Sequence, residues 1–307
     1  MLDLNKIYQG DCLEILKTLP KESVDCIVTS PPYWALRDYG VPGQLGLETT
    51  IAEYIENMAM VFDEVKRVLK VLGTCWVNMG DTYHHSKKWS KAKGKKRSGG
   101  ITFQDIGHRK QDQGIPEKSL CMIPQRLAIE MIDRGWILRN NIIWQKPNIR
   151  PQSAKDRFTV DFDNVFFFTK AQKYYFERQF EPTTGNTNSG RVDGQEGPKY
   201  RKDSFNNNRS SFRKKCKDPV IKRIKRCIWK IPTDQSSHSH CATYPERLIK
   251  VPIKAGCPGH GIVLDPFMGS GTTAVVAKKL GRSFVGIELN PEYIEISKQR
   301  LLQEVLF

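Results

Sequence analysis

Along this chain, short apolar runs of strand length alternate with longer stretches in which apolar residues recur every three or four positions. The apolar runs predict strands at Lys6–Asp11, Val24–Thr29, Thr74–Met79, Trp136–Trp144, Asp163–Lys170, Gly261–Asp265 and Ser283–Glu288. The helically spaced stretches predict helices at Cys12–Leu19, Ile51–Leu72, Pro124–Asp133, Thr272–Leu280 and Pro291–Leu302. Strands that alternate with helices indicate an α/β fold with a mostly parallel sheet, covered by helices on both faces.

Three local sequence features add detail to the predicted helices and strands. Asp11 is a suitable N-cap for the helix that follows it, and Pro291 occupies the first position of the last helix. No helical stretch separates Trp136–Trp144 from Asp163–Lys170, so we expect these two strands to form an antiparallel pair at a sheet edge.

Two polar stretches interrupt the α/β pattern. Ser86–Ser98 carries seven basic residues and no acid, which predicts a mobile loop that either solubilises the surface or contacts phosphates. Lys173–Lys230 holds 16 basic residues against 6 acidic ones, with aromatic residues interleaved. That composition is typical of an inserted module that recognises nucleic acid.

Composition and charge narrow the class of protein. The 307 residues carry a formal net charge of +16, which favours a polyanionic partner. No apolar stretch reaches the roughly 20 residues that span a bilayer, and Met1–Lys6 lacks the pattern of a signal peptide. The eight cysteines contain no C-x-x-C pair and are typical of reduced thiols. We therefore expect a cytoplasmic protein that is not inserted in a membrane.

The stretch from Gly261 to Glu288 has the layout of a nucleotide-binding βαβ unit. A glycine turn joins strand and helix, and Glu288 follows Asp265 by 23 residues, where an acid can hold ribose hydroxyls. Gly269–Ala274 also fits the loose G-x-G-x-x-G/A pattern of NAD enzymes. Chain order argues against a dinucleotide-binding domain, because such a domain continues with several more strands and here only one helix remains.

The strands that complete the sheet must then come from the N-terminal half. This arrangement places Asp11 beside Glu288, and Pro31–Pro32 on the other side of Asp265. All of them lie at the carboxyl edge of one sheet, where such folds bind ligands.

The strand Val24–Thr29 runs directly into Ser30-Pro31-Pro32-Tyr33-Trp34. Two prolines fix the backbone and leave the Pro31 carbonyl without a ladder partner. With the Ser30 hydroxyl and the Tyr33 ring, this carbonyl suits a flat ring that carries an exocyclic amine. The simpler alternative is a strand that ends in a proline turn.

Together, Thr29–Tyr33 and Asp265–Thr273 resemble motifs of the β-group of amino-methylating DNA methyltransferases, which use S-adenosylmethionine. The similarity covers nearly the whole chain, and the motif order is that of the β-group. Further segments that resemble family motifs are Gly10–Asp11, Leu69–Asp81, Asn140–Pro151, Asp163–Lys170 and His240–Leu248. Val71 and Leu72 depart from the pattern, because the family usually has Pro-Gly there.

The resemblance implies a class I S-adenosylmethionine-dependent methyltransferase fold with a seven-stranded, mostly parallel sheet in circularly permuted order. Residues 1–172 are expected to form the catalytic half, with a mobile basic loop at 84–116. Residues 173–234 are expected to form the inserted target recognition module, and 235–307 the cofactor-binding half. Double-stranded DNA is the implied partner, with a cognate restriction endonuclease as a further one, and the chain is expected to be a monomer or a weak homodimer.

The resemblance also implies roles for individual residues. The target base flips out of the duplex, Tyr33 stacks on it, and Ser30 and the carbonyl of Pro31 accept hydrogen bonds from its amine. The implied catalytic residues are Ser30, Pro31, Pro32 and Tyr33. The implied cofactor-binding residues are Asp11, Thr29, Tyr244, Pro245, Asp265, Pro266, Phe267, Gly269, Ser270, Gly271, Thr272, Thr273, Glu288 and Asn290. The residues expected to contact DNA are Lys87, Lys88, Lys95, Arg97, Arg201, Arg209, Arg213, Arg223 and Arg226.

No covalent intermediate is needed, so Cys12 and Cys26 are not candidates for a nucleophile. Ser30 favours cytosine N4 as the target, because adenine-methylating relatives usually carry Asp or Asn before Pro-Pro, although a hydroxyl and a carboxamide both accept from an amine. An adenine-N6 enzyme is the alternative. An RNA or protein methyltransferase and an inactive DNA-binding regulator are more distant ones.

A zinc site is a further alternative that the sequence raises. His238, His240, Cys241, Cys257 and His260 form a loose cluster of possible ligands. Zinc ligands normally come in compact pairs, and the His-Cys pair is better explained by the cofactor element. We therefore expect no metal.

Overall fold

The computed structural model describes residues 2–84, 114–149, 152, 154–182, 222–234 and 244–303. The chain divides into two compact units, of which the larger comprises Met1–Glu177 and Arg226–Phe307 and the smaller comprises Arg178–Lys225. In the described part of the chain, no helix is long and apolar enough to cross a bilayer.

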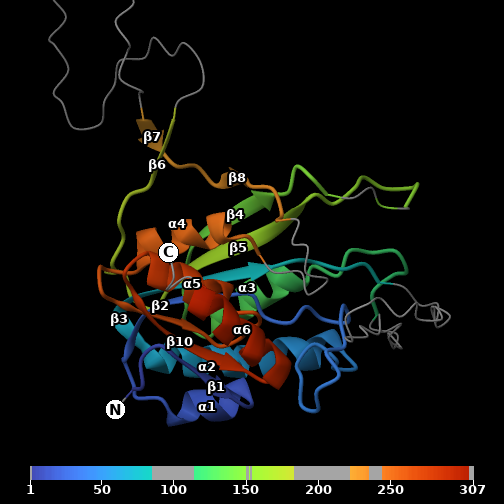
Figure 1. Ribbon diagram of the computed structural model, residues 1–307. Helices are drawn as coiled ribbons and strands as arrows, with labels where there is room; N and C mark the ends of the chain where they lie inside the picture. The colour runs from blue at the N-terminus through green and yellow to red at the C-terminus, as the bar shows by residue number, and fades with distance from the viewer. Residues whose placement is uncertain are drawn as a thin grey trace, which may run out of the picture. The chain divides into compact units, whose positions relative to one another are not determined.

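The larger unit is built on one eight-stranded sheet (Figure 1). Its strands in spatial order are β1 (Lys6–Gln9), β10 (Ser283–Glu288), β9 (Ile262–Asp265), β2 (Val24–Thr29), β3 (Leu69–Met79), β5 (Phe162–Thr169), β4 (Ile137–Gln145) and β8 (Ile228–Lys230). In this spatial order, the first five strands (β1, β10, β9, β2 and β3) are parallel to one another, and β5 is antiparallel to both β3 and β4. The mostly parallel sheet and the antiparallel pair are confirmed.

Two details of the predicted sheet are wrong. The described strands number eight rather than seven, because β8 pairs in parallel with β4 through Ile143 and Ile228. The antiparallel pair therefore does not lie at the sheet edge. A three-residue strand at the end of a long polar insertion has too short a pattern to be predicted from sequence.

The two ends of the chain close the sheet, as chain order predicts. β1 lies beside β10, and the Gly10 N–H donates to the carbonyl of Glu288 at 3.0 Å. On the other side of β9, Cys26 and Ile27 of β2 pair with Val263 and Leu264. Residues at the N-terminus and C-terminus thus reach the same carboxyl edge.

Helices cover both faces of the sheet (Figure 1). They are α1 (Cys12–Thr18), α2 (Ile51–Val68), α3 (Ile123–Asp133), α4 (Glu246–Gly256), α5 (Thr272–Lys279) and α6 (Pro291–Gln303). Buried residues of α1, α2 and α3 pack in one core cluster, and those of α4 and α5 pack in the other. Strand residues alternate between the two clusters: Phe166 and Phe168 join the first, and Val165 and Phe167 join the second. Both faces of the sheet are therefore buried.

The boundary between α2 and β3 differs from the prediction. Thr50 and Glu53 form a capping box at the start of α2, where the apolar spacing predicts that the helix begins. The helix was expected to reach Leu72 but ends at Val68, because Leu69 is extended and pairs with Val24 of β2. Gly73 permits this packing, since an added Cβ there would lie 2.4 Å from a methyl carbon of Leu69.

Helix α4 was not predicted. It contains Pro252, which lacks a backbone N–H and normally argues against a helix interior. Its buried residues Leu248, Ile249 and Ile253 nevertheless pack on the sheet. Tertiary packing of an apolar face outweighs the local cost of the proline.

The smaller unit contains a short antiparallel pair in its described residues. β6 (Phe180–Pro182) pairs with β7 (Lys222–Ile224), and the Arg223 guanidinium donates to the Glu181 carboxylate at 2.8 Å.

Candidate active site

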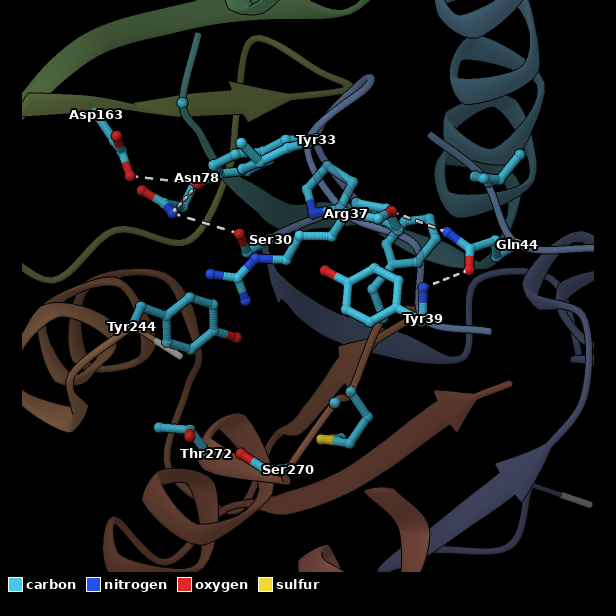
Figure 2. A pocket seen from close by; sticks show the side chains of 18 of the residues that line it. Ser30, Tyr33, Arg37, Tyr39, Gln44, Asn78, Asp163, Tyr244, Ser270 and Thr272 are labelled. Carbon is cyan, nitrogen blue, oxygen red and sulfur yellow. Dashed lines mark hydrogen bonds between the residues drawn. The ribbon is translucent and has the colours of Figure 1, made fainter. Parts of the chain in front are cut away.

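The carboxyl ends of five strands surround one cavity of 1470 Å³ in the larger unit (Figure 2). The residues that follow these strands line it: Asp11 after β1, Ser30 after β2, Gly80 after β3, Pro266 after β9 and Asn290 after β10. A ligand site at this edge is the expected place in an open α/β sheet.

One side of the cavity, here called the cofactor wall after the role that the sequence predicts for it, consists of Tyr244, the loop Gly269–Thr272 and Glu288. The Glu288 carboxylate accepts from the N–H groups of Gly269, at 2.7 Å, and Asn290, at 2.8 Å. Burial raises the pKa of Glu288 above its usual value. Gly269 has φ 54°, and a Cβ added there would meet nothing within 4 Å, so the loop presents open space to a ligand.

Asp265 holds the cofactor wall from behind. It is fully buried and accepts from the Thr29 hydroxyl at 2.6 Å, the Phe267 N–H at 3.0 Å and the Tyr244 hydroxyl at 3.0 Å. The Thr273 hydroxyl donates to it as well. Burial raises the pKa of Asp265, and these four donors act in the opposite direction. Asp265 therefore joins β2, β9, α5 and Tyr244 without lining the cavity.

The opposite side, here called the base wall after the role that the sequence predicts for Ser30–Tyr33, consists of Ser30, Pro31, Pro32, Tyr33, Asn78 and Asp163. The Asn78 amide nitrogen donates to the Tyr33 hydroxyl at 3.0 Å and approaches the Ser30 hydroxyl at 3.4 Å (Figure 2). The Tyr33 hydroxyl donates to Asp163 at 3.3 Å. Among the described residues, the Asn78 side-chain oxygen has no hydrogen-bond partner although it is buried. Three strand ends thus meet through one side-chain network.

An ion pair anchors this network. Lys146 lies 2.6 Å from Asp163, and both side chains are largely buried. Burial, followed by the charge of Asp163, raises the pKa of Tyr33 well above its usual value. The Tyr33 hydroxyl therefore stays neutral and can both donate and accept.

Close packing fixes the position of the Tyr33 ring. A Cβ added at Gly80 would lie 2.7 Å from a ring carbon of Tyr33 and 2.9 Å from the carboxylate of Asp163. On the other side, the Tyr54 hydroxyl donates to the carbonyl of Pro32 at 2.7 Å. The Ser-Pro-Pro-Tyr turn is therefore held from α2 as well as from β3.

The structure brings most of the predicted site residues together around the cavity. Those that line it are Asp11, Ser30, Pro31, Pro32, Tyr33, Tyr244, Pro266, Phe267, Gly269, Ser270, Thr272, Glu288 and Asn290. Those that stand behind its walls are Thr29, Pro245, Asp265, Gly271 and Thr273. The side chain of Asp11 also accepts from the N–H of Glu14 at 3.0 Å, which confirms it as the N-cap of α1.

Most of the predicted DNA contacts lie outside the described residues. They are Lys87, Lys88, Lys95, Arg97, Arg201, Arg209 and Arg213, and nearly all of the basic loop expected at 84–116 lies outside as well. Of the two that are described, Arg223 bonds to Glu181, and Arg226 is exposed just before β8.

The possible zinc ligands lie mostly outside the described residues too. These are His238, His240 and Cys241, and in the described part no three His, Cys, Asp or Glu side chains are grouped to hold a metal.

The thiol of Cys12 lines the cavity, but burial raises its pKa to about 12. It is therefore protonated at neutral pH and a poor nucleophile.

The sequence analysis does not name Asn78, Lys146 or Asp163 as site residues, although the segments Leu69–Asp81, Asn140–Pro151 and Asp163–Lys170, which resemble family motifs, contain them. One signal was available for Asn78, since it is a polar residue inside the apolar run Cys75–Met79, at the end of a strand that ends at the ligand edge.

Solved structures share this fold. The PvuII DNA methyltransferase (cytosine-N4-specific) matches with a TM-score of 0.63 and 22% identity, covering 96% of this chain and 85% of that one. A DNA modification methylase from Thermus thermophilus, complexed with S-adenosyl-L-methionine, matches with a TM-score of 0.59 and 24% identity, covering 97% and 95%. The fold is that of the class I S-adenosylmethionine-dependent methyltransferases.

Sequence comparison gives the family. A family model described as DNA methylase matches residues 24–299. The Type II methyltransferase M.Cfr9I of Citrobacter freundii is 39% identical over 306 residues, covering 99% of this chain and 90% of that protein. M.SmaI of Serratia marcescens is 36% identical over 300 residues, covering 97% and 91%. The chain therefore belongs to the DNA methylase family, as a site-specific Type II enzyme that methylates an exocyclic amino group of a DNA base.

Proposed function

We propose that this enzyme transfers the methyl group of S-adenosylmethionine to the N4 amine of a cytosine in double-stranded DNA. Ser30 carries this proposal, because its hydroxyl lines the cavity directly before Pro31–Pro32. Cytosine-N4 enzymes of the β-group usually have Ser at that position. The similarity of the fold to the PvuII enzyme, which is described as cytosine-N4-specific, supports the same target.

The cofactor wall fits S-adenosylmethionine. Glu288 lines the cavity and would hold the ribose hydroxyls, and the loop Gly269–Thr272 and Tyr244 would contact the rest of the molecule. The open space over Gly269 leaves room for a close backbone approach. When bound, the cofactor supplies a methyl group on a positively charged sulfur, which an amine nitrogen can attack.

The base wall would orient that amine. The Ser30 oxygen has two lone pairs, of which one faces the Asn78 amide nitrogen and the other is left for an amine hydrogen. The carbonyl of Pro31 would accept the second amine hydrogen. These two bonds draw the nitrogen lone pair out of conjugation with the ring and direct it toward the methyl group, so positioning supplies most of the rate.

The Tyr33 ring would stack on the flipped base. Gly80 and Tyr54 fix the turn that carries this ring, so the ring is preorganised before the base enters. Flipping costs a few kcal/mol in lost stacking and pairing, which contacts in the pocket offset.

The DNA contacts, a cognate restriction endonuclease, the monomeric or weakly dimeric state and a cytoplasmic location stay predictions. The formal net charge of +16 supports DNA binding through phosphates. Binding should therefore weaken steeply as salt concentration rises.

Nucleoside analysis tests the target base. The purified enzyme is incubated with methyl-labelled S-adenosylmethionine and unmethylated duplex DNA, and the DNA is digested for mass spectrometry. We expect label in N4-methylcytosine. Label in N6-methyladenine would overturn the inference from Ser30 and keep the family, and a duplex that already carries N4-methylcytosine at its sites is the matched control.

A further inference from the structure

The loop between β2 and α2 forms another part of the cavity. Its residues Arg37, Tyr39 and Gln44 line the cavity between the base wall and the cofactor wall. The Gln44 side chain accepts from the Tyr39 N–H at 2.6 Å and donates to the carbonyl of Arg37 at 3.1 Å. The Tyr39 ring packs edge-on against Tyr293 of α6, with the ring centres 6.2 Å apart. The backbone of Arg37 is thus held through its carbonyl, and the residues that follow it are held by Gln44 and by α6.

The Arg37 side chain extends from this loop into the cavity, between Ser30 and Tyr244 and toward the side that carries Ser270 and Thr272 (Figure 2). It is half-buried. The Arg37 guanidinium therefore lies among the side chains that line the cavity.

Among the described residues, two other basic side chains line the cavity, and each contacts a neighbouring side chain of the protein. Lys146 pairs with Asp163 at 2.6 Å. The Arg157 guanidinium stacks on the Tyr83 ring, 3.8 Å from its centre, and donates to Gln152 at 2.8 Å. Arg37 also interacts with other residues of the protein, and it differs from Lys146 and Arg157 by its place, since it faces the cofactor wall from across the cavity.

We propose that Arg37 binds the carboxylate at the amino-acid end of the cofactor. This deepens the proposed function and rests on S-adenosylmethionine as the ligand. A planar guanidinium matches a carboxylate with two parallel hydrogen bonds, and partial burial strengthens them. Glu288, which is expected to hold the ribose hydroxyls, lines the same cavity, and an amino-acid end that points away from it would reach toward Tyr244 and Arg37.

A DNA phosphate presents a similar oxyanion, and the position of Arg37 argues against it. The side chain points inward between Ser30 and Tyr244, whereas phosphates of a duplex stay at the surface when one base is flipped. The cofactor carboxylate enters the cavity with the rest of the cofactor and can therefore reach the Arg37 guanidinium between Ser30 and Tyr244.

Two ligands separate these possibilities by calorimetry. S-adenosylhomocysteine carries the amino-acid end and cannot react, whereas 5′-methylthioadenosine lacks that end. For Arg37→Ala we expect about a ten- to hundredfold loss of affinity for S-adenosylhomocysteine, the range of a charge-assisted hydrogen bond. Affinity for 5′-methylthioadenosine should stay within about twofold. Arg37→Lys should retain part of the affinity, and Arg157→Ala is the matched control that should retain all of it.

Equal losses for both ligands would overturn the proposal, because Arg37 would then only support the fold. Unchanged affinity for S-adenosylhomocysteine with weaker duplex binding would assign Arg37 to a phosphate instead. The titrations with S-adenosylhomocysteine and 5′-methylthioadenosine contain no DNA, so their outcome does not depend on whether cytosine is the target base. Thermal unfolding of each variant separates misfolding from lost binding.

Discussion

The cofactor wall and the base wall hold their polar groups by different means. In the cofactor wall, backbone N–H groups of Gly269 and Asn290 hold Glu288, and one buried carboxylate, Asp265, ties the surrounding elements together. In the base wall, Ser30 and Tyr33 are held by side chains from other strands, through Asn78 and Asp163. The first wall comes mostly from one continuous βαβ unit, and the second is assembled from distant segments.

This difference has a functional consequence. A wall in which backbone N–H groups of Gly269 and Asn290 hold the carboxylate tolerates little change in the chain that forms it. A wall made of side chains can be altered residue by residue. Substitutions in the cofactor wall should therefore impair binding, and substitutions in the base wall should impair transfer while binding persists.

The largest effect is expected from Gly269→Val. Gly269 has φ 54°, which a β-branched residue adopts only with strain, and the new side chain would fill the space left for the cofactor. We expect affinity for S-adenosylhomocysteine to fall by about a hundredfold or more in calorimetry.

Gly281→Val is the matched control. Gly281 also has positive φ, at 69°, with nothing within 4 Å of an added Cβ, but it follows α5 and does not line the cavity. It should lose stability and keep cofactor affinity. Similar loss of binding in both variants would show that backbone strain alone is responsible.

An intermediate effect is expected from Asn78→Leu. Leucine has a similar size but cannot donate to the hydroxyls of Ser30 and Tyr33. Single-turnover methyl transfer should fall by about ten- to hundredfold, as for loss of one preorganised donor, with affinity for S-adenosylhomocysteine within about twofold. Asn78→Asp should lose transfer as well, because a carboxylate cannot donate to either hydroxyl and places a second negative charge near Asp163, which already accepts from the Tyr33 hydroxyl. Unchanged transfer in Asn78→Leu would show that the hydrogen bonds from Asn78 do not contribute to methyl transfer.

A smaller, graded effect is expected from pH. Burial raises the pKa of Glu288, so the carboxylate takes up a proton at a higher pH than an ordinary glutamate does. Ribose hydroxyls donate to the ionised form, so affinity for S-adenosylhomocysteine should be complete above this raised pKa and decline as pH falls through it. Calorimetry between neutral and mildly acidic pH measures the decline.

Glu288→Gln should bind more weakly at neutral pH and lose this pH dependence. A pH dependence that persists in Glu288→Gln would point to another group, of which Asp265, whose pKa is also raised by burial, is the nearest candidate.

The sequence predicts the cofactor wall better than the base wall for the same structural reason. Glycine spacing and the distant acid at Glu288 lie within one stretch of chain, and chain order places Asp11 beside them. Asn78 and Lys146 become part of the site only when β3 and β4 are brought together by β5, and the sequence predicts the pairing of β4 with β5 but not that of β5 with β3. The basic segments that are expected to contact DNA stay predictions.

Each error in the predicted fold and site has an identifiable physical cause. Leu69 continues the apolar spacing of α2 but is recruited into β3 by pairing with Val24. Pro252 lies inside α4, where local propensity predicts no helix. Asp265, expected to touch the cofactor, is buried behind the wall it supports. In each case a tertiary contact outweighs the local signal.

The most direct test of the division between the two walls is Ser30→Ala, measured by single-turnover transfer and by calorimetry on the same preparation. We predict a loss of methyl transfer of about a hundredfold or more, because the amine loses the acceptor that orients it, with affinity for S-adenosylhomocysteine within about twofold of the unmodified enzyme. Tyr33→Phe, which keeps the ring and removes only the hydroxyl, should lose less transfer. Parallel losses of binding and transfer in Ser30→Ala would contradict the account, because Ser30 would then be a structural residue of the cavity.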